Sequence, residues 1–238
     1  MSKKTWLGLG ALGLVSFLLT LDDTALSVAL PSVGRDLGLG LSGLEWVVNA
    51  YTLALAALLL AGGRLADAFG ARRVFLIGLA GFTVASLAAG LAPSGVLLLA
   101  ARGLQGAGAA LVMPASLAVI HAGFPERRRG LAVGVWAGIS AAGLAIGPLV
   151  GAALTESLGW GSIFLVNVPV GVLALAAGRV ILAKSMPAAR ERRFDLAGML
   201  TSAVTLVALV FALTEGMSYG WRSPLVLASF AATAAGLV

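Results

Sequence analysis

Long apolar runs alternate with short polar joints along the whole chain. Most of these runs are long enough to cross a hydrocarbon core about 30 Å thick, which takes roughly 20 helical residues. Because backbone N–H and C=O groups in lipid must bond within their own segment, we expect the runs to be helices. The pattern predicts eight of them, near residues 6–30, 44–63, 74–92, 95–120, 130–154, 163–183, 196–215 and 223–238.

The last apolar run is shorter than most of the others. It begins near Ser223 and stops at Val238, with no basic residue behind it. We therefore expect the chain to end inside a helix and to be a fragment of a longer protein.

Composition agrees with a membrane protein and disfavours a soluble domain. The 238 residues are 60% hydrophobic and 11% charged, whereas soluble domains have about 25% charged residues. The 32 glycines suit a membrane bundle, because glycine lets helix backbones approach closely in lipid. The sequence has no cysteine, which excludes disulfides and thiolate metal sites.

The net charge of +6 reflects topology, because the basic residues gather in alternate joints. Lys and Arg are enriched on the cytoplasmic side of membrane proteins. The distribution therefore predicts a multi-pass protein of the inner (plasma) membrane with a cytoplasmic N terminus, and it disfavours a nucleic-acid-binding patch. The predicted cytoplasmic residues are Lys3, Lys4, Arg64, Arg72, Arg73, Arg127, Arg128, Arg129, Arg179, Lys184, Arg190, Arg192 and Arg193.

The N-terminal segment also resembles two other kinds of motif. Lys3-Lys4, the apolar run that follows and Ser27-Val28-Ala29 resemble a cleavable signal peptide, but cleavage would destroy the acidic motif described next. The segment from Gly8 to Gly13 matches G-x-G-x-x-G. A nucleotide site needs a strand before that motif, so we interpret these glycines as helix-packing residues.

Asp22 and Asp23 lie inside the first apolar run. Carboxylates are costly to keep at membrane depth and usually mark a functional site. We expect Asp22 to load and release a proton. Neighbouring residues on a helix differ by about 100°, so we expect one carboxylate to face a cavity and the other to lie nearer the outer interface. Simple solvation of both near the outer end is the alternative.

The joint from Gly63 to Arg73 resembles the signature loop of the major facilitator superfamily, G-x-L-a-D-[RK]-x-G-[RK]-[RK]. The matching residues include Gly63, Asp67, Gly70 and Arg72, while alanine replaces a basic residue at positions 68 and 71. The resemblance implies a cytoplasmic gate whose acid, Asp67, meets a helix end. A helix N terminus favours such an anion.

The fourth run carries Arg102 with Gln105 one turn later. An arginine at this depth needs a partner or a water-filled cavity. The segment resembles the R-x-x-Q-G motif of the same family, which implies that Arg102 takes part in proton coupling. A purely structural role for Arg102 is the alternative.

The fifth run resembles the antiporter motif of drug exporters through Gly143, Gly147, Pro148 and Gly151. Such a stripe of small residues permits close helix packing, and proline bends a helix. A generic packing helix is the alternative. The resemblance implies export rather than import. The segment around Asn167 resembles the start of the sixth span of drug:proton antiporters with 14 spans. Together with Asp23 and Gln105, Asn167 is a candidate for the cavity wall.

The resemblance implies an all-α fold: a six-helix N-terminal bundle over 1–183, then a cytoplasmic loop and two linker helices over 184–238. The second half of the transporter would be absent. The implied function is proton-coupled export of small lipophilic compounds, with the bilayer, the proton and the missing half as partners and no cofactor.

Three alternatives stay open at this stage: a half transporter without activity of its own, an importer of the same fold, and a membrane enzyme. The enzyme is least favoured, because the sequence contains no catalytic constellation and no metal-ligand spacing. The lone His121 fits an interfacial residue better than a proton relay.

Overall fold

The computed structural model describes residues 3–182 and 196–236, and it is helical throughout this part of the chain, without a strand. Residues 183–195 lie outside the described part of the chain. They include the expected boundary at 183/184 and four of the predicted cytoplasmic residues, Lys184, Arg190, Arg192 and Arg193. The helices are α1 (Lys3–Leu37), α2 (Leu41–Phe69), α3 (Ala71–Gly90), α4 (Gly95–Gly123), α5 (Glu126–Leu158), α6 (Gly161–Leu165), α7 (Asn167–Ile181), α8 (Leu196–Tyr219) and α9 (Pro224–Gly236).

The predicted apolar runs are confirmed as helices. Seven helical stretches are long and apolar enough to cross a membrane, and α6 and α7 together form one of them, over Gly161–Val180. The eighth run is the 13-residue helix α9, which is shorter than a full span. The structure thus gives an all-α integral membrane fold.

The sixth span is interrupted between α6 and α7, and Pro169 explains the interruption. Proline has no N–H to donate to the carbonyl four residues earlier, here that of Leu165. Val166, which links the two helices, keeps right-handed helical angles (φ −63°, ψ −26°). The chain therefore keeps a right-handed helical path through Val166, and Asn167 is the first residue of α7.

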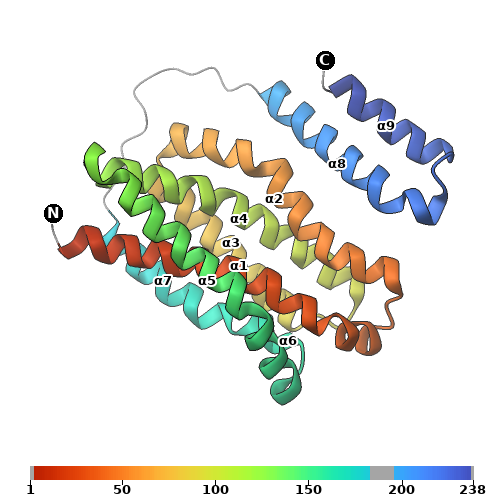
Figure 1. Cartoon of the computed structure of the whole chain (residues 1–238), viewed down its shortest axis with the longest axis horizontal. Coiled ribbons are helices and arrows are strands. Elements are labelled where there is room, and N and C mark those ends of the chain that lie inside the picture. The colour runs from red at the N-terminus through yellow and green to blue at the C-terminus, as the bar shows by residue number, and fades with distance from the viewer. Residues whose placement is uncertain (1–2, 183–195, 237–238) are drawn as a thin grey trace.

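Helices α1 and α5 run parallel and pack on each other, and so do α2 and α4 (Figure 1). In each pair, the first helix of one three-helix repeat packs on the second helix of the other repeat. This is expected for two repeats of opposite topology. Gly70, at φ +89°, is the single residue between α2 and α3. A left-handed angle of this kind favours glycine.

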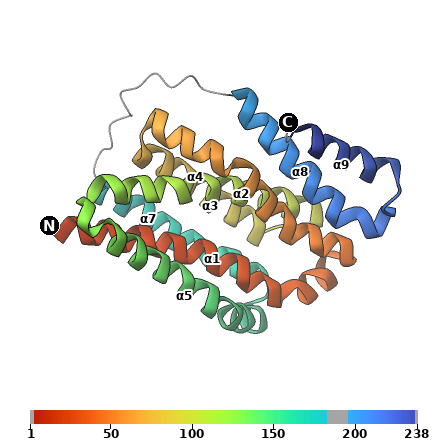
Figure 2. The ribbon, with the colours of Figure 1, turned by 45° about the horizontal axis from the view of Figure 1, so that its top comes forward.

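The hairpin of α8 and α9 lies outside this bundle, beside α2 (Figure 2). Within the described ranges, α8 contacts only α2 and α9, and α9 contacts only α8. The hairpin is therefore attached to the rest of the molecule through one helix.

The bundle interior has two apolar clusters, one nearer each end. On α1, the first cluster includes Leu9 to Leu19 and the second includes Leu21 to Val33. Asp22 is fully buried at the boundary between them. The polar residues of the site therefore occupy a layer at mid-height of the bundle.

Candidate functional site

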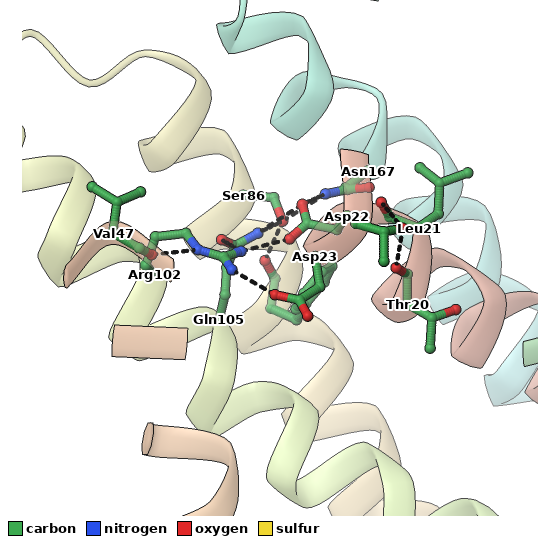
Figure 3. Close-up of polar contacts among 11 residues, drawn as sticks. Thr20, Leu21, Asp22, Asp23, Val47, Ser86, Arg102, Gln105 and Asn167 are labelled. Carbon is green, nitrogen blue, oxygen red and sulfur yellow. Dashed lines mark hydrogen bonds and ion pairs between the residues drawn. The ribbon is translucent and has the colours of Figure 1, made fainter. Parts of the chain in front are cut away.

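The guanidinium of Arg102, on α4, is fully buried at the centre of the bundle (Figure 3). Its Nη1 donates to Asp22 Oδ2 at 2.7 Å and to Gln105 Oε1 at 3.2 Å. Its Nε donates to the backbone carbonyl of Val47 at 3.1 Å. A buried arginine is tolerated only where its charge and its N–H groups are satisfied, and this site meets both conditions.

Asp22, on α1, receives hydrogen bonds from several helices. Besides the ion pair with Arg102, its Oδ1 accepts from Gln105 Nε2 at 3.3 Å and from Asn167 Nδ2. Gln105 belongs to α4 and Asn167 begins α7. Asp22 thus ties α1 to two helices of the second repeat inside the membrane span.

Asp23 reaches the same guanidinium from the other side, although it is the sequence neighbour of Asp22. Its Oδ1 lies 3.1 Å from Arg102 Nη2, and 37% of its side chain is exposed, against none for Asp22. The two carboxylates do differ in exposure, as expected. Both carboxylates nevertheless pair with one cation, because the long arginine side chain reaches each of them.

Three residues complete the site and were not singled out from the sequence. Arg102 Cζ lies 4.4 Å from the ring centroid of Tyr51 and 5.9 Å from that of Phe164, distances at which a cation is attracted to an aromatic face. Ser86 Oγ accepts from Gln105 Nε2 at 2.8 Å. A tyrosine and a serine inside apolar runs are too common to be recognised without the helix rotations.

The glycines of α4 explain how Tyr51 comes so close. A Cβ atom at Gly106 would collide with the backbone of Tyr51. This close approach of α4 to α2 places the Tyr51 ring and the Val47 carbonyl beside Arg102. Gly106 therefore shapes the site without contributing a polar group.

The predicted antiporter motif forms the contact between α5 and α1. Cβ atoms at Gly143, Gly147 and Gly151 would collide with α1, while Pro148 is exposed. The glycines that precede the motif in sequence differ, since a Cβ atom at Gly134 or Gly138 would meet nothing within 4 Å. The stripe therefore acts only along the segment of α1 that flanks Asp22.

The predicted gate residues lie at the end of the bundle that carries the N terminus. Gly70 makes the turn, Asp67 is exposed on the last part of α2, and Gly63 lies near Pro114. Arg72 Nη2 donates to the backbone carbonyl of Arg179 near the end of α7. These residues are not part of the Arg102 cluster, and their gating role remains a prediction.

Gln105 and Asn167 lie inside the bundle with no accessible surface. Of the three candidates for the cavity wall, Asp23 is the one that is partly exposed. No group of three or more histidine or acidic residues suited to a metal ion occurs in the part of the chain that the structure describes.

A second buried carboxylate, Glu215 on α8, was not assigned a role from the sequence. It is 5% exposed, and its Oε1 accepts from the indole Nε1 of Trp46 and from Ser42 Oγ at 3.5 Å. Nearby, Asn49 Nδ2 donates to Thr214 Oγ1 at 3.3 Å. These bonds attach the α8–α9 hairpin to α2.

Residues 12–235 match the family described as the Major Facilitator Superfamily. The chain is 46% identical over 225 residues to a puromycin resistance protein of Streptomyces alboniger, covering 94% of this chain and 44% of that protein. It is 43% identical to a multidrug resistance protein of Mycobacterium tuberculosis, covering 94% of this chain and 42% of that protein.

A tetracenomycin C resistance and export protein of Streptomyces glaucescens is 37% identical, with 92% of this chain and 40% of that protein covered. Among solved structures, a peptide transporter in complex with sulfate superposes with a TM-score of 0.70 at 17% identity, over 94% of this chain and 49% of that one. The chain spans less than half the length of these curated relatives. With a matching family over nearly all of its residues and seven helices able to cross a membrane, the chain belongs to the major facilitator superfamily and is a multi-pass membrane protein.

Proposed function

We propose that this chain is the N-terminal part of a proton-coupled exporter of small lipophilic compounds, in the branch of the family with 14 spans. The printed names of several relatives refer to drug resistance or export. The exporter-type glycine motif packs on α1 next to the acidic pair, which supports export rather than import. Residues 1–183 would be the transporting half, and 184–238 the linker helices.

The observation that carries the proposal is the charge balance of the buried site. Asp22 and Asp23 together bring two negative charges to a single guanidinium, Arg102. No other cation pairs with these carboxylates among the residues described. With both acids ionised the site carries one uncompensated negative charge, and uncompensated charge is costly at membrane depth.

One proton or one cationic substrate removes that imbalance. A proton from the outside binds Asp22 and makes the site neutral, which removes the attraction for a cationic lipophile. Release of the proton toward the cytoplasm restores the negative charge and the affinity for the next substrate molecule. Proton and substrate therefore compete for the same charge, which is the requirement for exchange.

The proposal includes an orientation in the membrane and a second six-helix half. The N terminus would be cytoplasmic, with the gate residues Asp67 and Arg72 on that side of the inner membrane. The substrate would bind between this half and a second six-helix half, and rocking of the halves would expose it to either side. The relatives are more than twice as long as the aligned part, which supports a second half.

The experiment measures efflux of a lipophilic cation, at an acidic and at an alkaline external pH, from cells that express the complete reading frame containing this chain. We expect Asp22→Asn to abolish the pH dependence of efflux. Glu156→Gln, which removes an exposed carboxylate on α5, is the matched control and should leave it unchanged. Full pH-dependent export by Asp22→Asn would contradict the proposal.

A further inference from the structure

The side-chain amide of Asn167 is fully buried, but only its nitrogen forms hydrogen bonds. Its Nδ2 donates to Asp22 Oδ1 and to Ser86 Oγ, the latter at 3.4 Å. Its Oδ1 is buried and accepts from no group in the described part of the chain. Most buried polar atoms in proteins have a partner, so this unpaired oxygen beside a carboxylate calls for an explanation.

The side-chain amide of Gln105 also contacts Asp22, so it can be compared with that of Asn167. Gln105 also donates to Asp22 Oδ1, from Nε2 at 3.3 Å, but its Oε1 accepts from Arg102 Nη1 and its Nε2 also donates to Ser86. Both ends of the Gln105 amide are engaged, so its orientation is fixed. The Asn167 amide is engaged at one end, so reversing it costs fewer hydrogen bonds.

We propose that Asn167 is a positioning residue that contacts Asp22 in both of its protonation states. The proposal rests on the proposed function, in which Asp22 gains and loses a proton. When Asp22 is charged, Asn167 Nδ2 donates to the carboxylate. When Asp22 is protonated on Oδ1, its O–H donates to Asn167 Oδ1 after a half-turn of the amide.

The geometry favours protonation on the oxygen that faces Asn167. Asp22 Oδ2 is held by Arg102 Nη1 at 2.7 Å, and a proton there would have to displace the cation. Asp22 Oδ1 contacts only the two neutral amides. In this step Asp22 Oδ1 gains one proton and forms one O–H bond. All other changes are exchanges of hydrogen bonds.

A reversal of this amide requires little space. The amide oxygen and nitrogen are almost the same size and are not distinguished by shape, and the terminal torsion of asparagine is broad. In each orientation one end of the Asn167 amide contacts Asp22 and the other end is unpaired. Asn167 therefore gives the charged and the protonated Asp22 a similar number of contacts.

The charged and titratable groups around this pair come from three helices. Helix α1 supplies Asp22 and Asp23, α2 supplies Tyr51, and α4 supplies Arg102. Helix α3 contributes the neutral Ser86. Asp22 is the acid that touches Asn167, so the amide should respond to its proton first.

The sequence allows a direct test, because it contains only two asparagines, Asn49 and Asn167. Replacing Asn49 by glutamine leaves Asn167 as the single site for a ¹³C label on the asparagine side-chain carbonyl. The measurement is an infrared titration of the labelled, purified chain. The band of the protonated Asp22 carboxyl is identified by its loss in Asp22→Leu, which adds no asparagine.

We expect the labelled carbonyl band to shift to lower wavenumber as Asp22 takes up its proton, with the same midpoint, because the carbonyl then accepts a hydrogen bond. The shift should be absent in Asp22→Leu, which adds no asparagine, and retained in Gln105→Leu. If the Asp22 carboxyl band titrates while the labelled band stays fixed, the inference is wrong and the proposed function stands. If no Asp22 band appears at any accessible pH, the proposed function fails, and the inference with it.

Discussion

Two buried carboxylates, Asp22 and Glu215, are held in opposite ways. Asp22 pairs with a guanidinium and accepts from two amides, and it links α1 with α4 and α7. Glu215 accepts only from an indole N–H and a hydroxyl, and it links α8 with α2 alone. The first acid belongs to the centre of the bundle, whereas the second attaches a peripheral hairpin. Burial alone therefore does not tell which acid matters for the core.

The largest effect should come from removing the cation of the central site. Arg102→Ala leaves both carboxylates without their cation, and breaking a buried ion pair costs about 3–5 kcal/mol. We expect a clear fall in the midpoint of thermal unfolding in detergent. Arg127→Ala, at an exposed position on α5, is the control. Equal stability of the two variants would show that Arg102 is not required by the fold.

An intermediate effect should follow from separating α1 and α5. A Cβ atom at Gly151 would lie 2.7 Å from the Cα of Ala25, and overpacking of this kind costs about 1–3 kcal/mol. Gly151→Ala should therefore lower the unfolding midpoint. Gly138→Ala on the same helix meets open space and should leave stability unchanged or slightly raised, because alanine favours helices. Similar losses in both variants would refute the role assigned to the stripe.

The smallest effect should arise at the hairpin. Glu215→Ala leaves the partly buried indole N–H of Trp46 without its acceptor, which costs about 1–2 kcal/mol. Hydrogen exchange should accelerate in α8 and α9 and remain unchanged in α1 to α7. Met217→Ala, at a residue that is 83% exposed, serves as the control. Faster exchange across the whole bundle would mean that Glu215 supports more than the hairpin.

The helical spans were readable from the sequence, because backbone groups in lipid must be satisfied and because the apolar runs have the length of a membrane. The buried charges were readable for a similar reason: Asp22 and Arg102 are too costly at that depth to lack a function or a partner. The two glycine-containing motifs could be located by resemblance. The structure places Gly70 between α2 and α3, and the glycines Gly143, Gly147 and Gly151 of α5 against α1.

What the sequence did not reveal depends on helix rotation and on contacts between distant segments. The shared use of Arg102 by Asp22 and Asp23 requires the reach of one long side chain. The contact of Glu215 with Trp46 joins positions 169 residues apart. Tyr51 and Ser86 carry no signal in a run of apolar residues.

The single-helix attachment of the hairpin has a practical consequence for following motion. Within the described ranges, α8 contacts only α2 and α9. A fluorescent or spin label on the exposed side of α9 would therefore move together with α2. Such a label would report displacement of α2 while leaving every group around Arg102 chemically untouched. The hairpin therefore offers a place to follow movement of α2 from outside the bundle.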